Sequence, residues 1–361
     1  MRYGMLLFLL LPFLGQFYVS WRTWQLLPTP IWIKVLTVTL MAVALLCLIL
    51  KFSIPSERLS LGLNQLIYEV GTSWIIIMLY LAMLYLVMDI GRWCHLIPRT
   101  FTHSSVAGTA FVITVLLATF VYGNLHYRNK VRQSLELDSK GKVSKPIKVV
   151  MMSDLHLGFH NRRAEFARWV DIINREQADL ILIAGDIIDI SVDPLLRENV
   201  AEEWKRLNAP VYACMGNHEY FAQEPRARQF ITDAGINLLQ DSVAVVGDLC
   251  IIGRDDLTNR RRMPLDRLTA NIDRSKFSIL LDHQPYHLEQ AQKAHIDFQF
   301  SGHTHHGQVW PINWITDAIY EDAWGPHKKG DTQYYVSSGI GIWGGKFRIG
   351  TRSEYIVATI L

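Results

Sequence analysis

The hydrophobic residues of this chain follow two different patterns. Four long apolar runs fill the first third of the sequence, at residues 5–21, 31–50, 71–88 and 106–122. A membrane-spanning helix needs about 17–25 mostly apolar residues, and these runs meet or approach that length. From residue 146 onward, short apolar segments alternate with amphipathic ones. The pattern predicts a four-helix transmembrane region at 1–122 and a globular domain after it.

The first run is short and contains Pro12, which is also compatible with a signal peptide. No small-residue cleavage site follows it, however, and the next residues include Tyr18, Trp21 and Trp24. Aromatic side chains are enriched where a helix leaves the bilayer. We therefore interpret the first run as a retained anchor.

The second pattern predicts an α/β domain at 147–361. Phe166, Trp169, Val170 and Ile173 share one face of a helix expected at 163–176. Further helices are expected at 195–207 and 226–234. Strands are expected at 148–153, 179–184, 211–215, 243–246, 249–253, 277–281, 298–301, 333–337 and 355–360. Early alternation followed by many strands favours a two-sheet β-sandwich flanked by helices. The polar residues 123–146 are expected to form a linker.

Charge supports the same division. Residues 1–130 contain nine Lys or Arg and three Asp or Glu, whereas the remaining 231 residues contain 27 and 30. The second part is therefore about one quarter charged, as in soluble domains. A charge-poor apolar part followed by a part of ordinary charge content excludes a disordered chain, and four scattered cysteines exclude a disulfide scaffold. A net charge of +3 gives no reason to expect a nucleic acid partner.

Basic residues next to the apolar runs predict the orientation, because cytoplasmic flanks carry more Lys and Arg. An N-terminus inside the cell gives a multi-pass inner (cell) membrane protein with the C-terminal domain in the cytoplasm. The inner segments then contain Arg2, Lys51, Arg58, Arg128, Lys130, Arg132, Lys140, Lys142 and Lys145, and the outer ones Arg22, Arg92 and Arg99. If the first run does not cross, this topology inverts. The centres of the runs lack charged residues, which argues against a transporter.

Polar clusters follow most of the predicted strands. They read DLH at 154–156, GDIID at 185–189, GNHE at 216–219 and GHTHHGQ at 302–308, with a single His283 after 277–281. Open α/β sheets place ligands at the carboxyl ends of their strands. Eight N/O donors are therefore expected on one rim: Asp154, His156, Asp186, Asn217, His218, His283, His303 and His305.

Carboxylate, carboxamide and imidazole donors without thiolates suit Mn, Fe or Zn ions, and this mixture accommodates two of them with one bridging carboxylate. Each cluster alone has a structural explanation, since a D-x-H triplet is common and GD often marks a turn. All five clusters in this order make that explanation untenable for the set.

The series DLH, GDIID, GNHE, His283 and GHTH resembles the calcineurin-like metallophosphoesterase superfamily over about 147–361. GHTHHGQ and the later SSGIGIWGG are similar to a bacterial branch of phosphodiesterases that includes membrane-anchored ones. The resemblance implies an α/β/β/α fold and two divalent metal ions. Asp154, His156, Asp186 and His305 would hold the first ion, and Asp186, Asn217, His283 and His303 the second.

The resemblance also implies a mechanism, in which a hydroxide bridging the two metals attacks phosphorus in line. His218 would act near the leaving group as the catalytic imidazole. Asp189 is expected to support a ligand or a loop, and Glu219 stands where many relatives have Asp. Arg162, with His160 and Arg163, could contact a substrate phosphate or could simply begin a solvated helix.

Two further segments remain open in function. The aromatic segment 310–324 follows GHTHHGQ directly, and could be a core flap or a platform resting on the bilayer. Arg254 and the run Arg260, Arg261 and Arg262 could bind an anionic head group or could be ordinary surface charge.

We therefore expect a membrane-anchored, dinuclear-metal phosphoesterase that hydrolyses a phosphodiester or pyrophosphate bond. The resemblance implies a phosphate-ester substrate, and the tether to the lipid bilayer suggests that a membrane lipid carries it. The alternatives are a protein phosphatase and a metal-binding sensor or scaffold without catalysis.

Overall fold

The computed structural model describes residues 2–361, with side chains from residue 10 onward, and the chain divides into two compact units. The first unit contains Met1–Leu125 and Gly344–Lys346, and the second contains His126–Trp343 and Phe347–Leu361. The division thus lies close to the change in hydrophobic pattern.

The first unit consists of helices. Its elements are α1 (Arg2–Leu26), α2 (Ile31–Ser53), the 3-10 helix η1 (Ser56–Arg58), α3 (Leu61–Trp93), α4 (Arg99–Thr102) and α5 (Val106–Arg128). Within the described residues, three of these helices are long and apolar enough to cross a membrane: α2, α3 and α5. Of the four predicted spans, three are thus found in the part of the chain that the structure describes.

The first predicted run lies in α1, and its residues 5–9 and the side chain of Arg2 fall outside the described side chains. The described part of α1 is interrupted by polar groups that bind α3. The Arg22 guanidinium is buried and lies 2.8 Å from the Asp89 carboxylate, and Gln16 accepts a hydrogen bond from the Trp74 indole over 2.8 Å. These groups join the described part of α1 to α3 by an ion pair and a hydrogen bond.

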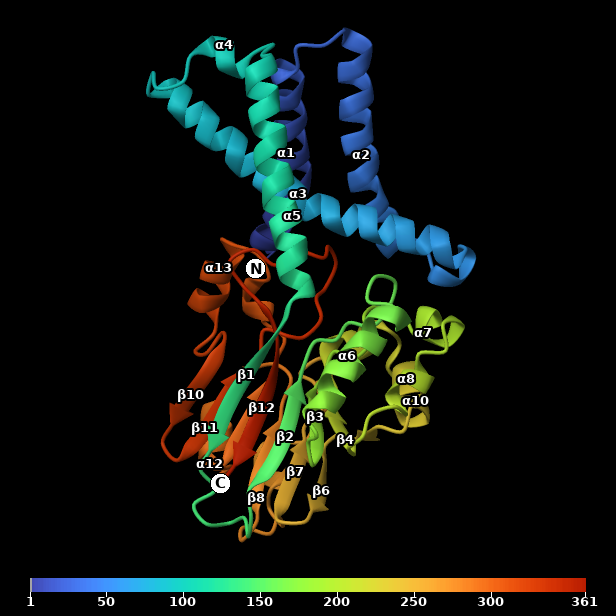
Figure 1. Ribbon diagram of the computed structural model, residues 1–361, viewed down its shortest axis with the longest axis vertical. Coiled ribbons are helices and arrows are strands. Elements are labelled where there is room, and N and C mark those ends of the chain that lie inside the picture. The colour runs from blue at the N-terminus through green and yellow to red at the C-terminus, as the bar shows by residue number, and fades with distance from the viewer. Residues whose placement is uncertain (1) are drawn as a thin grey trace. The chain divides into compact units, whose positions relative to one another are not determined.

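The second unit contains two six-stranded sheets (Figure 1). The first sheet has the order β1-β12-β2-β3-β4-β5 and the second β10-β11-β9-β8-β7-β6. Strands β2 to β5 run parallel, as do β7, β8, β9 and β11. The strands are β1 (Lys130–Leu137), β2 (Ile147–Met152), β3 (Leu180–Ala184), β4 (Val211–Cys214), β5 (Asn237–Leu238), β6 (Ser242–Val246), β7 (Leu249–Gly253), β8 (Phe277–Leu281), β9 (Phe298–Ser301), β10 (Gly325–Lys329), β11 (Thr332–Val336) and β12 (Ser353–Ile360).

Helices cover the outer faces of both sheets. The first sheet is covered by α6 (Arg163–Arg175), α7 (Asp193–Arg197), α8 (Ala201–Trp204) and α10 (Glu224–Asp233), and the second by α11 (Leu265–Leu268) and α12 (Glu289–Lys293). The remaining helices, α9 (Asn217–Phe221), α13 (Ile312–Ile319) and the 3-10 helix η2 (His305–Gly307), stand in the segments that follow β4 and β9. Figure 1 shows α6, α8 and α10 beside the first sheet. The predicted two-sheet fold flanked by helices is confirmed.

Alternation along the strands produces three apolar layers. In β2, Val149 and Met151 pack between the sheets, whereas Val150 and Met152 pack under α6 and its neighbours. In β8, Ile279 and Leu281 join the layer between the sheets, and Leu280 faces α11 and α12. Each sheet is therefore buried on both faces, which is why its central strands are continuous apolar runs.

Two segments differ from the expectations. Residues 130–137, expected as part of a linker, form β1, which pairs in parallel with β12. Its alternating exposure is that of an edge strand, and its polar side chains account for the linker-like sequence. The helix expected at 195–207 is divided into α7 and α8, because Asn199 between them adopts a left-handed φ of 53°.

Candidate metal centre

The polar clusters lie where parallel strands end. Asp154 follows β2, Asp186 follows β3 and Asn217 follows β4 in the first sheet, while His283 follows β8 and His303 follows β9 in the second. Side chains from both sheets meet because the carboxyl ends of these strands lie at a common edge. His283 Nε2 is 3.2 Å from Asp186 Oδ2, which links the two sheets at this point.

The backbone that presents these donors is strained. Asp154, His156, Asp186, His303 and His305 all have φ between 44° and 70°, a region that costs non-glycine residues free energy. Two glycines allow the loops to approach each other. A Cβ on Gly216 would lie 2.2 Å from Asp186 Oδ1, and one on Gly302 would lie 2.3 Å from Asp154 Oδ2. Such strain clusters at functional sites.

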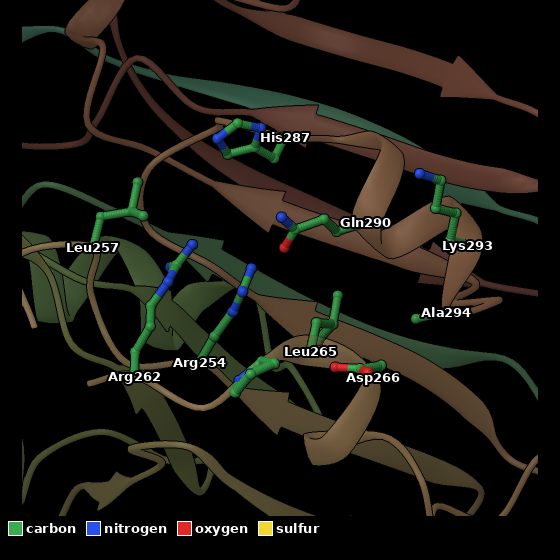
Figure 2. Close-up of a pocket in the computed structure, with 10 residues that line it drawn as sticks. Arg254, Leu257, Arg262, Leu265, Asp266, His287, Gln290, Lys293 and Ala294 are labelled. Atoms are coloured by element: carbon green, nitrogen blue, oxygen red, sulfur yellow. The ribbon is translucent and has the colours of Figure 1, made fainter. Parts of the chain in front are cut away.

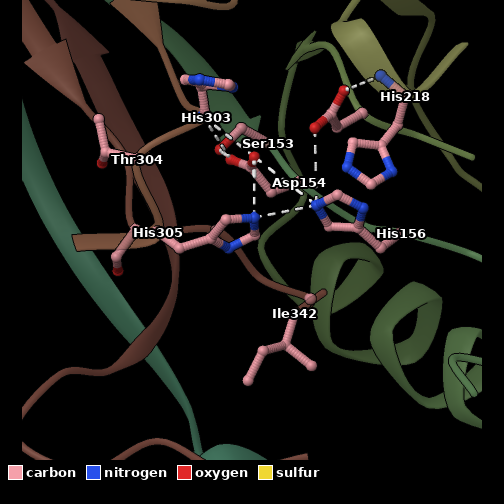
Figure 3. A network of polar contacts seen from close by, with 12 residues as sticks. Ser153, Asp154, His156, His218, His303, Thr304, His305 and Ile342 are labelled. Atoms are coloured by element: carbon pink, nitrogen blue, oxygen red, sulfur yellow. Dashed lines mark hydrogen bonds and ion pairs between the residues drawn. The ribbon is translucent and has the colours of Figure 1, made fainter. Parts of the chain in front are cut away.

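The first donor group joins Asp154, His156 and His305 (Figure 3). The Nε2 atoms of His156 and His305 are 3.0 Å apart, and His305 Nε2 is 3.4 Å from Asp154 Oδ1. Asp186 Oδ2 lies 3.6 Å from His156 Nε2. Ser153 and the backbone N–H of His303 both donate to Asp154 and so hold its carboxylate in place.

The second donor group joins Asp186, His283 and His303, with Asn217 beside them. Asn217 Oδ1 is 3.1 Å from His283 Nε2 and 2.9 Å from His303 Nδ1. His283 Nδ1 lies 2.8 Å from the Ala184 carbonyl, to which it donates. That hydrogen bond leaves the lone pair on Nε2, which faces Asp186.

These residues fit a pair of divalent cations. Ligands about 2.1 Å from one ion lie about 3.0–3.4 Å from each other, and two pairs in each group have this spacing: His156–His305 and Asp154–His305 in the first, Asp186–His283 and Asn217–His283 in the second. The carboxylates of Asp154 and Asp186 are buried, and neither forms an ion pair with Lys or Arg among the described residues. Buried charge needs compensation, and the oxygen Asp186 Oδ2 faces both donor groups. The donors contain no thiolate, which suits Mn, Fe or Zn ions.

His218 and Asp189 lie beside the first donor group. His218 Nδ1 is 3.2 Å from Asp189 Oδ1 and 3.1 Å from the Asp189 carbonyl. Asp189 also lies 3.6 Å from His156 Nδ1. Burial lowers the pKa of His218, but Asp186 and Asp189 outweigh it and raise this pKa to about 9. Asp189 therefore lies on the Nδ1 side of both imidazoles, away from the Nε2 atom by which His156 faces His305 and Asp186.

Glu219 has a structural role that its sequence position did not reveal. Its carboxylate is fully buried and accepts hydrogen bonds from the backbone N–H groups of Asp186 (3.1 Å), Ile188 (2.9 Å) and Gly216 (2.7 Å). These contacts join the loop after β3 to the loop after β4. Glu219 thus fixes the backbone on which two of the donors stand.

The structure does not bring Arg162 into this cluster. Its guanidinium lies on the surface, 2.6 Å from Glu198, and Arg163 pairs with Glu203 over 2.8 Å. His160 is buried and lies 2.6 Å from the Ile342 carbonyl. The basic residues at the start of α6 therefore serve that helix and its neighbours, since each guanidinium already has a carboxylate partner.

Arg348 is a residue of the centre that we did not predict. It is fully buried and donates to the carbonyls of His305 (2.7 Å), Gly341 (3.2 Å) and Ser338. The guanidinium thus ties the backbone of one donor to the loop after β11. The only available signal was its place shortly after SSGIGIWGG, because its partners are backbone carbonyls that no side-chain pattern reveals.

The aromatic segment borders the second donor group. The Tyr320 ring centroid is 6.4 Å from that of His303, and Tyr320 accepts a hydrogen bond from Tyr286 over 3.0 Å. His306 stacks on Trp324 at 4.9 Å. On α13, by contrast, Trp314 and Ile319 are about 60% exposed. One end of the segment therefore packs at the centre while the other presents apolar side chains outward.

Comparisons with known proteins agree with this geometry. Residues 147–307 match the family model for calcineurin-like phosphoesterases. An uncharacterized metallophosphoesterase of Helicobacter pylori is 28% identical over 226 residues, which cover 61% of either chain. One of Aquifex aeolicus is 29% identical over 258 residues, covering 69% of this chain and 97% of that one.

A transmembrane protein with metallophosphoesterase domain from Danio rerio is 29% identical over 265 residues, covering 68% of this chain and 60% of the relative. The chain thus spans about three fifths of the length of the Helicobacter and Danio relatives. The family match begins at β2 and ends at the last predicted donor loop. The chain therefore carries a domain of the calcineurin-like metallophosphoesterase superfamily.

Proposed function

We propose that this protein is a membrane-anchored, metal-dependent phosphoesterase that hydrolyses a phosphodiester or pyrophosphate bond. The observation that carries the proposal is the position of Asp186 Oδ2, which lies 3.6 Å from His156 Nε2 and 3.2 Å from His283 Nε2. One buried carboxylate oxygen thus serves two donor groups, as a site for two adjacent cations requires.

The residues divide into two sets of ligands that share Asp186. Asp154, His156 and His305 complete the first set, and Asn217, His283 and His303 complete the second. When bound, the two cations would neutralise phosphate charge and lower the pKa of a nearby water. The protein supplies rigid placement, since Glu219, Arg348 and Ser153 hold the ligand-bearing loops.

His218 is the residue we assign to the leaving group. The backbone carbonyl of Asp189 accepts a hydrogen bond from His218 Nδ1, and the Asp189 carboxylate lies beside the same nitrogen. Nε2 is therefore the His218 nitrogen that remains for a substrate oxygen. The ring of His218 lies 4.4 Å from that of His156, edge to face, which places it beside the metal ligands without adding to them. From this position a protonated imidazole can donate to a departing oxygen.

We further propose that the substrate is carried by a membrane lipid. Three apolar helices suit a bilayer, and α13 presents Trp314, Ile315 and Ile319 as exposed apolar side chains. The segment that contains α13 also supplies Tyr320 beside His303. A surface that rests on lipid next to the metal centre would bring a lipid-borne phosphate within reach.

The catalytic domain is proposed to lie in the cytoplasm. The basic residues that follow α5, from Arg128 to Lys145, support this, because flanks within about 15–20 residues of a span determine orientation. If α1 does not cross, an N-terminus inside the cell would place the domain outside, and the cytoplasmic assignment then rests on the basic residues after α5.

The decisive experiment uses the full-length protein in detergent, loaded with Mn²⁺ and assayed on a generic phosphodiester and a generic phosphomonoester. We expect faster diester turnover, reduced at least about 100-fold in Asp186→Asn and in His218→Asn. Asp186→Asn should also lose bound metal, whereas His218→Asn should keep both ions. Asp331→Asn, a surface carboxylate far more exposed than Asp186, is the matched control and should leave turnover unchanged.

Full turnover in His218→Asn would remove this residue from the mechanism. Absence of turnover on either substrate and on phospholipid vesicles, with two metals bound, would favour a metal-binding sensor or scaffold. Preference for phosphorylated peptides would favour a protein phosphatase.

A further inference from the structure

A second cavity lies away from the metal donors, between α11 and α12 (Figure 2). Its volume is about 520 Å³, within the range of small-molecule sites. Arg254 and Arg262 point into it from the loop after β7, and Gln290 and Lys293 line it from α12. Leu257 and Leu265 add apolar surface.

This cavity and the metal centre lie on opposite faces of the second sheet. Leu281, the last residue of β8, packs between the sheets. The strand pairing with β9 continues for two more residues, because Asp282 N–H donates to the Phe300 carbonyl and Gly302 N–H donates to the His283 carbonyl. Because successive side chains alternate, Asp282 faces outward, where it meets Arg254, and His283 faces the metal donors. A ligand in the cavity is therefore not the group bound at the metals.

The charges in the cavity are unbalanced. Arg254 Nη1 and Arg262 Nη1 each lie 3.1 Å from one carboxylate, that of Asp282. Two guanidinium groups thus share a single negative charge, while both side chains are more than nine-tenths buried. Lys293 adds a third cation, and the exposed Asp266 is the one carboxylate among the lining residues. Three cations thus lie near two carboxylates, those of Asp282 and Asp266, and an excess of positive charge remains in this partly open cavity.

Arg254 also has an unused donor. Its Nε–H is buried and has no hydrogen-bond partner among the described residues. A buried guanidinium donor without a partner is unfavourable. Paired guanidiniums favour phosphate oxygens, which they bind through parallel hydrogen bonds.

We propose that this cavity is a binding site for a small phosphorylated organic molecule of about mononucleotide size. The phosphate lies between Arg254, Arg262 and Lys293, and the organic part rests against Leu257 and Leu265. The site requires no metal and is separate from the proposed catalytic function.

The test is isothermal titration of the full-length protein in detergent, stripped of metal with a chelator, using adenosine monophosphate and, separately, inorganic phosphate. Removing the metal suppresses anion binding at the metal centre, because the carboxylates of Asp154 and Asp186 then repel an anion. We expect saturable binding of adenosine monophosphate, weakened at least about tenfold in Lys293→Gln and in Arg262→Gln. Arg197→Gln removes an exposed charge on α7 and should bind as the unmodified protein does.

Lys293 is exposed on α12, so its replacement tests the site even if Arg262→Gln reduces folding. Tighter binding of the nucleotide than of phosphate would support a phosphorylated organic ligand, whereas equal binding would reduce the site to one for phosphate alone and overturn that part of the proposal. The proposal fails if no saturable binding occurs at millimolar concentrations, or if both pocket variants bind normally. It also fails if binding needs metal and disappears in Asp186→Asn.

Discussion

At the scale of single residues, the donors depend on groups that never face a metal. Glu219 accepts from three backbone N–H groups, and Arg348 donates to four backbone carbonyls in the loops that carry the donors. These two buried side chains fix the loops in a strained conformation that the chain would otherwise leave. Positioning residues of this kind are as necessary to the geometry as the ligands.

Glu219→Ala is expected to destabilise the metal-free protein by about 3 kcal/mol, because buried N–H groups lose their acceptor. Glu219→Gln retains an acceptor oxygen and should cost less. Urea unfolding of the metal-free protein measures both variants. Glu202→Ala, which removes a surface carboxylate on α8, is the control and should change stability by less than about 0.5 kcal/mol. Equal stabilities for Glu219→Ala and this control would contradict the role.

Asp322 gives the fold a dependence on pH. Burial raises its pKa to about 6, so the folded state binds this proton more tightly than the unfolded state does. The resulting stability is present below the ordinary pKa of 3.8 and is lost as the pH rises through 6. Asp322→Asn avoids the buried charge and should be more stable than the unmodified protein at pH 7.5, by about 1–2 kcal/mol. Thermal unfolding at pH 4 should show no such difference, and a difference independent of pH would refute the assignment.

At the scale of elements, α13 combines an exposed apolar face with a connection to the centre. Trp310 packs edge to face on Trp314 at 5.3 Å, and Asp317 on the same helix lies 3.4 Å from His306 Nε2. The helix therefore extends the donor loop that contains His303 and His305. Sequence analysis left two interpretations of this segment, and the exposure of Trp314 and Ile319 favours a surface over a core flap.

The double variant Trp314→Ser/Ile319→Ser tests the lipid proposal. Removing two exposed apolar side chains should lower turnover of a phosphodiester embedded in vesicles about tenfold and leave turnover of a water-soluble diester unchanged. Leu196→Ser, an exposed apolar residue on α7, should affect neither substrate. If soluble diesters are turned over far faster than any lipid substrate and the double variant has no effect, the substrate is not lipid-borne.

At the scale of the whole molecule, the proposed topology can be tested with a native cysteine. Cys94 is exposed just after α3, whereas Cys214 and Cys250 are buried. Because α5 separates Cys94 from the second unit, the two should lie on opposite sides of the membrane. A membrane-impermeant maleimide should therefore label the protein in intact cells, and Cys94→Ser should abolish the signal. Labelling that appears only after permeabilisation would place the catalytic domain outside the cytoplasm.

The sequence alone determined most of the second unit. Buried strands at the centre of a sheet must be apolar on both faces, so 179–184 and 277–281 were recognisable as β3 and β8 without any partner. The polar clusters were recognisable for a related reason. Residues such as Asp186 and His303 stand next to apolar strands, where a polar side chain needs a function or a partner.

Only the tertiary structure decided three other features. Residues 130–137 became β1 because β12, more than 200 residues later, offers a parallel edge. Arg348 is held at the metal centre by hydrogen bonds to backbone carbonyls, which every residue type has, so the sequence could not identify its partners. The described part of α1 binds α3 through Arg22 and Asp89, a pairing that its apolar pattern does not reveal. Local patterns record which face of an element is buried, whereas the choice of partner depends on packing between segments distant in sequence.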